Sequence, residues 1–296
     1  MKKLLSTLAL LFAITAAHAQ QVVPVVWVFA LSSSQGNMVR EIIHEANSQQ
    51  TKYQFIFEHK PGAGGAVGVN YVASLKQPAI LAHTSSYFIR PYMYKDGSYD
   101  VNQFEILNSY CNDQPLALIS RNYKTLAELA KRSTASVGLL PGSITELLVE
   151  QYKNVNPKID LTTVGFKGTP DITLQVLGGH IDLSVDWLAG VNNDNLNVLG
   201  ITGVHNYDNA KTFRSQGLFG FEEIANSYYL FINKNTDPTV TKELNDIMAR
   251  AVVAPRVRAY CQQDFGQYSN VSGSPAQNIF RQKHQYWKTQ VEKIAK

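Results

Sequence analysis

Cysteine is scarce in this sequence, and neither sign of charge dominates it. Only Cys111 and Cys261 occur among 296 residues, and two cysteines so far apart do not form a metal-binding motif. We expect two buried free thiols and not a disulfide, because free cysteine is often a core residue, although an exported protein would permit the disulfide. The formal net charge is only +4 and the Lys and Arg residues are scattered, which argues against a nucleic-acid partner.

Long hydrophobic runs are absent beyond the N-terminus. No later segment reaches the ~18 apolar residues that cross a membrane. The N-terminus combines Lys2 and Lys3 with an apolar run over 4–17 and a small-residue cleavage pattern, Ala-His-Ala at 17–19. This combination predicts a cleavable signal peptide over residues 1–19 and a mature chain outside the cytoplasm, whose net charge falls from +4 to +2 without the two lysines. No cysteine follows the apolar run, so we expect no lipid anchor.

Catalytic and metal-binding signatures are missing as well. There is no Gly-x-Ser-x-Gly elbow, and the histidines show neither HExxH nor another ligand spacing. His59 and His83 flank polar turns, but we interpret them as surface or hydrogen-bonded residues. The sequence therefore predicts no enzyme, no cofactor and no metal. A secreted hydrolase with Ser33 or Ser143 as nucleophile is the alternative, and it would need a base that no sequence signal supplies.

The sequence does contain a repeated order of strand, polar turn and helix. Apolar, β-branched runs predict strands, and apolar residues at helical spacing follow several of them, as at 38–46 and 67–75. This order is typical of an α/β fold in which helices cover a parallel sheet. The expected strands lie at 22–30, 53–58, 79–82, 136–140, 161–166, 181–185 and 196–201.

Two further strand-like runs, at 115–120 and 228–233, are interpreted as connections between two domains. A helix over 238–253 then returns to the first domain. Two crossings can form a hinge, because a few backbone dihedral changes in both strands would open a cleft. The predicted division is a discontinuous domain 1 at 20–117 plus 231–296, and a domain 2 at 118–230.

The most informative motif is a glycine-rich turn, Lys-Pro-Gly-Ala-Gly-Gly-Ala-Val-Gly at 60–68, between an expected strand and an expected helix. Glycines let the backbone approach a ligand closely, and the dipole of the following helix favours an anion. The turn is not a P-loop, because no Lys-Ser/Thr pair follows, and Val67 breaks the dinucleotide-binding spacing. A tight turn without a ligand is the alternative.

Three other turns are rich in hydroxyl groups, and each precedes an expected helix: 32–37, 84–86 and 142–145. Hydroxyls and free N–H groups can together hold a carboxylate, although each turn by itself is also a common helix cap. In open α/β sheets such turns face the ligand crevice. We expect Asp186 to line this crevice and Asp182 to lie at the surface.

In this order the motifs resemble the extracytoplasmic receptors of tripartite tricarboxylate transporters, the Bug family. The turn at 60–68 is similar to that family's Arg-Pro-Gly-Ala-Gly-Gly loop. Gly-Phe-Lys-Gly-Thr-Pro at 165–170 resembles its Tyr-Lys-Gly-Thr turn, and Leu-Gly-Gly-His-Ile-Asp at 177–182 resembles its Leu-Gly-Gly-x-Val-Asp segment. Leu-Phe-Ile at 230–232, followed by Pro238, resembles the return to the first domain. The similarity covers nearly all of the mature chain.

The resemblance implies a two-domain, type II periplasmic-binding-protein (Venus flytrap) fold without enzymatic activity. It also implies that a small organic carboxylate binds between the domains and is delivered to a membrane permease. A periplasmic ligand-sensing module for a signalling partner is the alternative, and in either role we expect a monomer. The expected ligand-binding residues are Ser32, Ser33, Ser34, Gly62, Ala63, Gly64, Gly65, Ser85, Ser86, Gly142, Ser143, Thr145, Gly168, Thr169 and Asp186.

The first ligand loop departs from the family pattern. The family has Pro-Gly-Gly-x-Thr-Asp before its first helix, whereas this chain has Leu-Ser-Ser-Ser-Gln-Gly at 31–36. Gly36 stands in place of the acid if Arg40 aligns with the family's arginine. Because burying an unpaired ammonium is costly, the missing acid predicts a ligand without a protonated amine. Asp186 weakens this argument, since it could supply the charge from the other domain.

Overall fold

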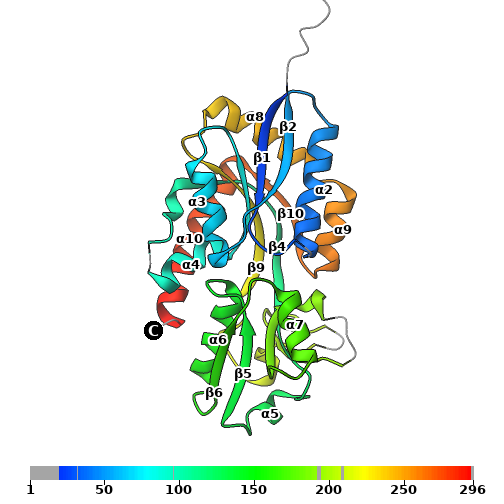
Figure 1. The fold of residues 1–296 in the computed structure, drawn as a ribbon, viewed down its shortest axis with the longest axis vertical. Coiled ribbons are helices and arrows are strands. Elements are labelled where there is room, and N and C mark those ends of the chain that lie inside the picture. The colour runs from blue at the N-terminus through cyan, green and yellow to red at the C-terminus, as the bar shows by residue number, and fades with distance from the viewer. Residues whose placement is uncertain (1–19, 32, 96, 192–194, 208–209, 295–296) are drawn as a thin grey trace, which may run out of the picture.

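The computed structural model describes residues 20–31, 33–95, 97–191, 195–207 and 210–294. The expected signal peptide and Ser32 lie outside these ranges. Two lobes lie one above the other and are joined by strands that run between them (Figure 1). Within the described ranges, no helix combines the length and the apolar character needed to cross a membrane.

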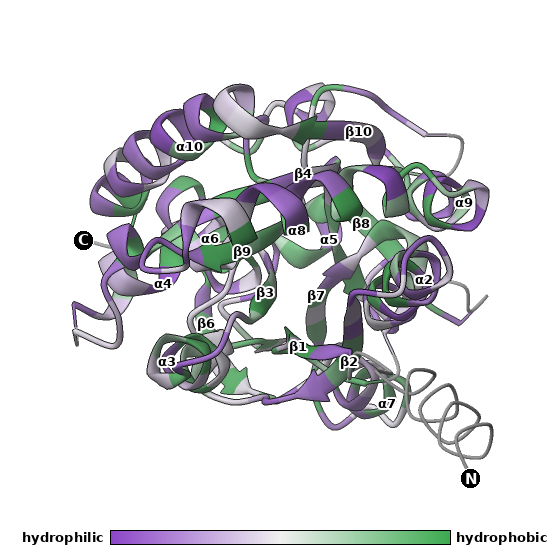
Figure 2. Cartoon of the chain, turned by 90° about the horizontal axis from the view of Figure 1, so that it is seen from above, coloured by the Kyte–Doolittle hydropathy of each residue, from purple (hydrophilic) through white to green (hydrophobic). Residues whose placement is uncertain are grey.

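The upper lobe in Figure 1 is built on strands in the order β2–β1–β3–β9–β4, with β10 added on β4. β1 is parallel to β2 and to β3, as the strand–turn–helix order predicts, whereas β9 runs antiparallel to both of its neighbours. Helices α2, α3 and α10 lie around these strands when the molecule is viewed from above (Figure 2). The elements of this lobe are β1 (Gln21–Trp27), α2 (Ser34–Ser48), β2 (Tyr53–His59), α3 (Ala66–Ser74), β3 (Ile80–Thr84), α4 (Ser86–Tyr94), β9 (Ala225–Asn233), α8 (Pro238–Ala251), α9 (Pro255–Gln263), β10 (Gln267–Ser272) and α10 (Gly273–Ile294).

The lower lobe repeats the parallel arrangement on a smaller scale. β5 lies between β6 and β7 and is parallel to both, and β8 pairs antiparallel with the end of β4. Helices α6 and α7 follow β5 and β6, so that each begins where a strand ends. The elements are α5 (Leu126–Leu129), β5 (Thr134–Leu139), α6 (Ile144–Val155), β6 (Asp160–Gly165), α7 (Thr169–Leu177), β7 (Leu183–Trp187) and β8 (Asn197–Ile201).

A single long strand, β4 (Phe104–Ser120), belongs to both lobes. Its residues up to Pro115 pair with β9, and from Leu116 onward they pair with β7. Strand β4 therefore changes its pairing partner between these two residues, while β9 pairs with β3 and with the part of β4 up to Pro115. The domain boundaries at 117/118 and 230/231 stay predictions, and the pairing pattern locates the connection through β4 at Pro115.

Helix α10 makes a further connection between the lobes. It begins beside β4, and its last turn reaches α6 of the lower lobe, where the Asn154 side-chain amide donates a hydrogen bond to the carbonyl of Ile294 (3.0 Å). Trp287, Val291 and Ile294 are buried along its length. The C-terminal segment was expected to belong to the first domain alone, but its end packs on both lobes.

The two cysteines form a disulfide, so the prediction of free thiols was wrong. Cys111 lies on β4 and Cys261 on α9, with their Cα atoms 5.8 Å apart. Strand β10 follows α9 and pairs antiparallel with β4, with Tyr268 opposite Cys111. This return of the chain brings α9 onto β4. The spacing of the two residues in the sequence contains no information about that return.

Candidate functional site

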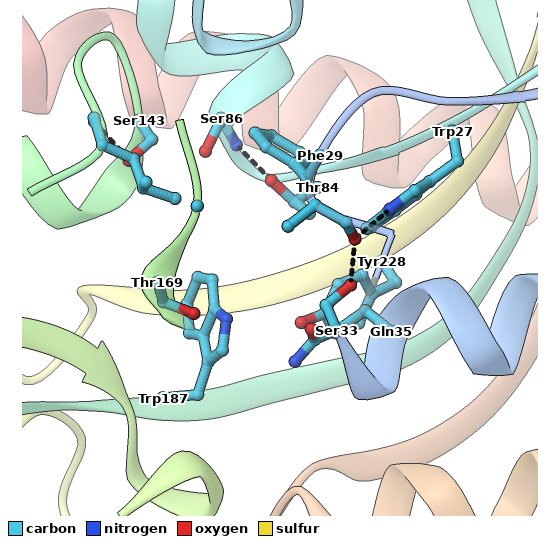
Figure 3. Close-up of a pocket in the computed structure, with 13 residues that line it drawn as sticks. Trp27, Phe29, Ser33, Gln35, Thr84, Ser86, Ser143, Thr169, Trp187 and Tyr228 are labelled. Atoms are coloured by element: carbon cyan, nitrogen blue, oxygen red, sulfur yellow. Dashed lines mark hydrogen bonds between the residues drawn. The ribbon is translucent and has the colours of Figure 1, made fainter. Parts of the chain in front are cut away.

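A cleft lies between the two lobes, at the ends of the strands that lead into α2, α4, α6 and α7. Its empty volume is about 400 Å³, including the open solvent at its mouth. Figure 3 shows Ser33, Gln35 and Tyr228 on one side, facing Thr169 and Trp187 on the other. The residues that line it are Trp27, Phe29, Ala30, Ser33, Gln35, Thr84, Ser86, Leu140, Ser143, Gly168, Thr169, Trp187 and Tyr228.

The first loop places Ser33 at the start of α2. Its hydroxyl accepts a hydrogen bond from the Gly36 N–H (3.1 Å) and donates one to the Ala30 carbonyl (2.8 Å), which also accepts from the Trp27 indole (3.1 Å). Ser33 therefore both caps the helix and lines the cleft. Gly36 is buried within this cap, and a Cβ there would lie 3.3 Å from the Trp27 indole nitrogen.

The glycine-rich loop lies at a neighbouring hollow that shares Phe29 and Leu140 with the main cleft. Gly62, Ala63, Gly64 and Gly65 line it. All four have positive φ angles, which side chains resist. The loop then continues directly into α3.

The glycines of this loop also permit close packing. A Cβ on Gly64 would come within 2.6 Å of the Pro141 carbonyl, which belongs to the lower lobe, and one on Gly65 would come within 2.2 Å of the His83 ring. His83 is fully buried, and burial lowers its pKa to about 3. The loop is therefore a contact between lobes, and its expected ligand-binding residues line the neighbouring hollow and not the main cleft.

The turn at the start of α4 separates the two serines that were expected to act together. Ser86 lines the cleft, and its hydroxyl accepts a hydrogen bond from the Ile144 N–H of the lower lobe (3.2 Å). Ser85 faces β9 instead, where its hydroxyl accepts from the Ser227 N–H (3.0 Å). Ser85 does not line the cleft, because the turn directs its side chain toward β9.

The corresponding turn of the lower lobe is held by its own hydroxyl groups. Ser143 caps α6 by accepting from the Thr145 N–H (3.1 Å) and donates to the Leu140 carbonyl (2.8 Å). The Thr145 hydroxyl accepts from the Leu140 N–H (2.9 Å) and is fully buried, so of these two side chains only Ser143 reaches the cleft. Gly142 packs against Arg90 of the upper lobe, whose guanidinium would lie 2.4 Å from a Cβ at that position.

These hydrogen bonds bear on the hydrolase alternative. Both candidate nucleophiles, Ser33 and Ser143, donate their protons to backbone carbonyls. A serine nucleophile needs a general base within hydrogen-bond reach, and neither hydroxyl has one among its partners in the described part of the chain. The same part of the chain contains no cluster of three or more His, Cys, Asp or Glu residues that could hold a metal ion.

The remaining expected residues lie on the lower-lobe side of the cleft. Gly168 precedes α7 and packs against Ala30, with 2.9 Å between a Cβ built on it and the alanine methyl. Thr169 opens α7 and lines the cleft beside it. Asp186, at the end of β7, is 5% exposed. Burial raises its pKa to about 6. The hydrogen bond that it accepts from the Trp187 N–H (2.7 Å) acts in the opposite direction and lowers the pKa, but by less.

Asp186 lies in an adjoining hollow that sequence reasoning did not anticipate. This hollow shares Ser33, Gln35, Thr169 and Trp187 with the main cleft and also contains Ser34 and Asp264. The Ser34 hydroxyl donates to the Asp264 carboxylate (2.8 Å). Asp264 ends α9 of the upper lobe, and no pattern in the sequence indicates that this turn reaches the cleft. Trp27, Phe29 and Tyr228 also line the cleft and were not expected there, because they belong to apolar runs that read as buried strands, whereas Gln35 lies in the polar turn at 32–37 that was expected to face the ligand.

A family model for the tripartite tricarboxylate transporter family receptor matches residues 39–295. The chain belongs to this receptor family. The family resemblance inferred from the glycine-rich, Lys-Gly-Thr and Leu-Gly-Gly motifs is thereby confirmed. The members of the family are solute receptors and not enzymes. No curated protein is significantly similar to this receptor in sequence.

Solved structures share its fold. The periplasmic binding protein BugD superimposes with a TM-score of 0.82 at 20% identity, over 94% of this chain and 98% of that one. A protein of R. palustris with adipate gives 0.81 at 18% identity, over 94% and 98%. MatC from Rhodopseudomonas palustris with bound malate gives 0.79 at 19% identity, over 92% and 99%. The receptor therefore has the predicted two-lobed periplasmic-binding-protein fold.

Proposed function

We propose that this receptor binds a small organic carboxylate in the cleft between its lobes and delivers it to a membrane permease. The observation that carries the proposal is the convergence of four helix starts, from both lobes, on one cleft. Ser33, Ser86, Ser143 and Thr169 cap or open these helices, and all four line it. The helix dipole at such positions favours an anion, and hydroxyl groups can donate hydrogen bonds to it.

Two further facts support this reading. The similar structures from R. palustris contain adipate and malate, which are both dicarboxylates. The expected signal peptide over 1–19 would export the chain, and BugD is described as a periplasmic binding protein. We therefore propose that the receptor acts in the periplasm, where it would capture its solute for the permease.

Binding would be coupled to closure of the lobes. The lobes contact each other at the cleft, where the Ile144 N–H donates to Ser86, and also through the Tyr94 hydroxyl, which donates to Glu146 (2.9 Å). The connection at Pro115 in β4 is the place where the backbone could bend. A ligand can favour the closed arrangement only through interactions that the open arrangement lacks.

A thermal-shift screen tests the proposal. Small carboxylates with and without amines are compared with glucose and spermidine, using the mature chain. A carboxylate at ~100 times its Kd should stabilise the fold by about 2.7 kcal/mol. Small-angle scattering with that compound should show a smaller radius of gyration. Stabilisation by the sugar or the polyamine alone would overturn the proposal.

A further inference from the structure

Two buried carboxylates from opposite lobes lie at one end of the cleft. Asp186 comes from β7 of the lower lobe and Asp264 from the end of α9 of the upper lobe, and both line the same hollow. Each is only 5% exposed. Burial raises the pKa of both groups, and the negative charge of Asp264 adds to the shift at Asp186. The charge of Asp264 therefore disfavours ionisation of Asp186.

Neither carboxylate is neutralised by the protein. Asp264 accepts hydrogen bonds from Ser34 (2.8 Å), Gln35 (3.3 Å) and Gln114 (3.4 Å), all of which are uncharged. Asp186 accepts from its neighbour's N–H and from a threonine hydroxyl. In the described ranges no Lys or Arg forms an ion pair with either. A buried charge without a partner of opposite sign is costly, so this end of the cleft suits a positive group.

A tyrosine hydroxyl supplies an independent indication. Tyr228 lines the cleft and is fully buried, and its hydroxyl lies near the Asn226 and Gln35 side chains without forming a hydrogen bond of good geometry to any described residue. It lies beside Gln35, with Trp187 on the opposite side (Figure 3). Gln35 donates to the Asp264 carboxylate (3.3 Å) and lies beside Tyr228, so it links the acid to the phenol. After burial, the charge of Asp264 also helps to raise the pKa of Tyr228. A phenol oxygen can accept a hydrogen bond from an ammonium group, and an indole face attracts one.

We propose that Asp186, Asp264 and Tyr228 form a subsite for a cationic group, so that the solute is a carboxylate that also carries a protonated amine. This inference rests on the proposed function, because the helix starts would hold the carboxylate end. The main cleft and the acidic hollow share four lining residues, so one small molecule can reach both. The proposal replaces our prediction of a ligand without an amine. That prediction relied on a missing acid beside the first loop, and α9 brings Asp264 to Ser34 and Gln35 of that loop.

Calorimetric titration of the mature chain tests the cationic subsite by comparing carboxylic acids that differ in whether they carry an amine. Aspartate is compared with succinate, glutamate with glutarate, and 4-aminobutyrate with butyrate. At least one amino acid should bind about ten- to hundredfold more tightly than its plain counterpart, since hydrogen bonds to charged groups contribute about 1.5–3 kcal/mol. Tighter binding of the plain acids would overturn the cationic subsite and leave the proposed function intact. No binding of either kind, together with stabilisation by sugars or polyamines alone, would overturn both.

Variants distinguish the effect of the subsite from the effect of the protein's net charge. Asp264→Asn should weaken binding of the preferred amino acid about ten- to hundredfold, while the plain acid binds as well as before or better. Asp246→Asn is the matched control, because it removes one negative charge from an exposed pair with Lys242. Tyr228→Phe removes a hydroxyl that forms no hydrogen bond of good geometry to a described residue, so the fold should persist while the amino acid binds severalfold more weakly. If both Asp264→Asn and Tyr228→Phe kept the unmutated protein's preference for the amino acid over the plain acid, the subsite would be refuted.

Discussion

Replacing Gly64 by alanine should weaken ligand binding more than it weakens folding. The residue has φ +60°, and a Cβ built on it would lie 2.6 Å from the Pro141 carbonyl and 3.1 Å from that of Gly142. Real Cβ atoms essentially never come within 3.0 Å of such an atom. Both carbonyls belong to the lower lobe, so the collision exists only while the lobes are together. The lobes of the variant would have to close less far.

The two costs of this substitution can be estimated separately. A left-handed backbone at alanine costs about 1–2 kcal/mol in any folded form. Overpacking at a rigid contact costs about 1–3 kcal/mol more, and this part falls on the closed form alone. Because only a difference between open and closed forms changes affinity, the ligand should bind about 5- to 150-fold more weakly.

Gly97→Ala is the matched control. Gly97 has φ +63°, close to that of Gly64, but a Cβ there meets nothing within 4 Å. Thermal unfolding without ligand should therefore show similar losses in both variants. Calorimetry with a carboxylate that stabilises the unmutated protein should show weaker binding for Gly64→Ala only. Equal affinities in the two variants would refute the claim that this loop meets the lower lobe in the liganded form.

Three further outcomes follow from the same structure. Burial raises the pKa of Asp186 from 3.8 to about 6, so the folded chain holds this proton more tightly than the unfolded chain and stability should fall as pH rises from about 4 to 6. Asp186→Asn should remove this fall and raise the free energy of unfolding at pH 7 by up to about 3 kcal/mol in urea titrations, and a variant less stable than the unmutated protein at pH 7 would contradict this. Replacing Cys111 and Cys261 by alanine should lower the free energy of unfolding by up to about 5 kcal/mol, because the bridge closes a loop of 150 residues; an unchanged denaturation midpoint would count against it. Ser86→Ala removes the acceptor for the Ile144 N–H across the lobes and should weaken ligand binding by about 1 kcal/mol. An unchanged Kd in calorimetry would contradict this.

Local patterns were sufficient for much of the fold. The strands expected at 53–58 and 161–166 correspond closely to β2 and β6, and the helix expected at 67–75 is α3. Hydrophobic periodicity reports the faces of individual elements, and the polar turns between them mark where helices begin. The sequence also indicated, through Ser33 and Ser143, which turns line the cleft.

Contacts between distant segments decided the rest. The sequence alone suggested that Ser85 and Ser86 act together, but pairing of β3 with β9 turns Ser85 toward Ser227 and leaves Ser86 in the cleft. The return of β10 onto β4 unites the two cysteines and carries Asp264 to the first loop. Composition and periodicity describe each segment by itself. The partners of a side chain are set by packing between segments far apart in the chain, and these contacts determined both the disulfide and the acidic end of the cleft.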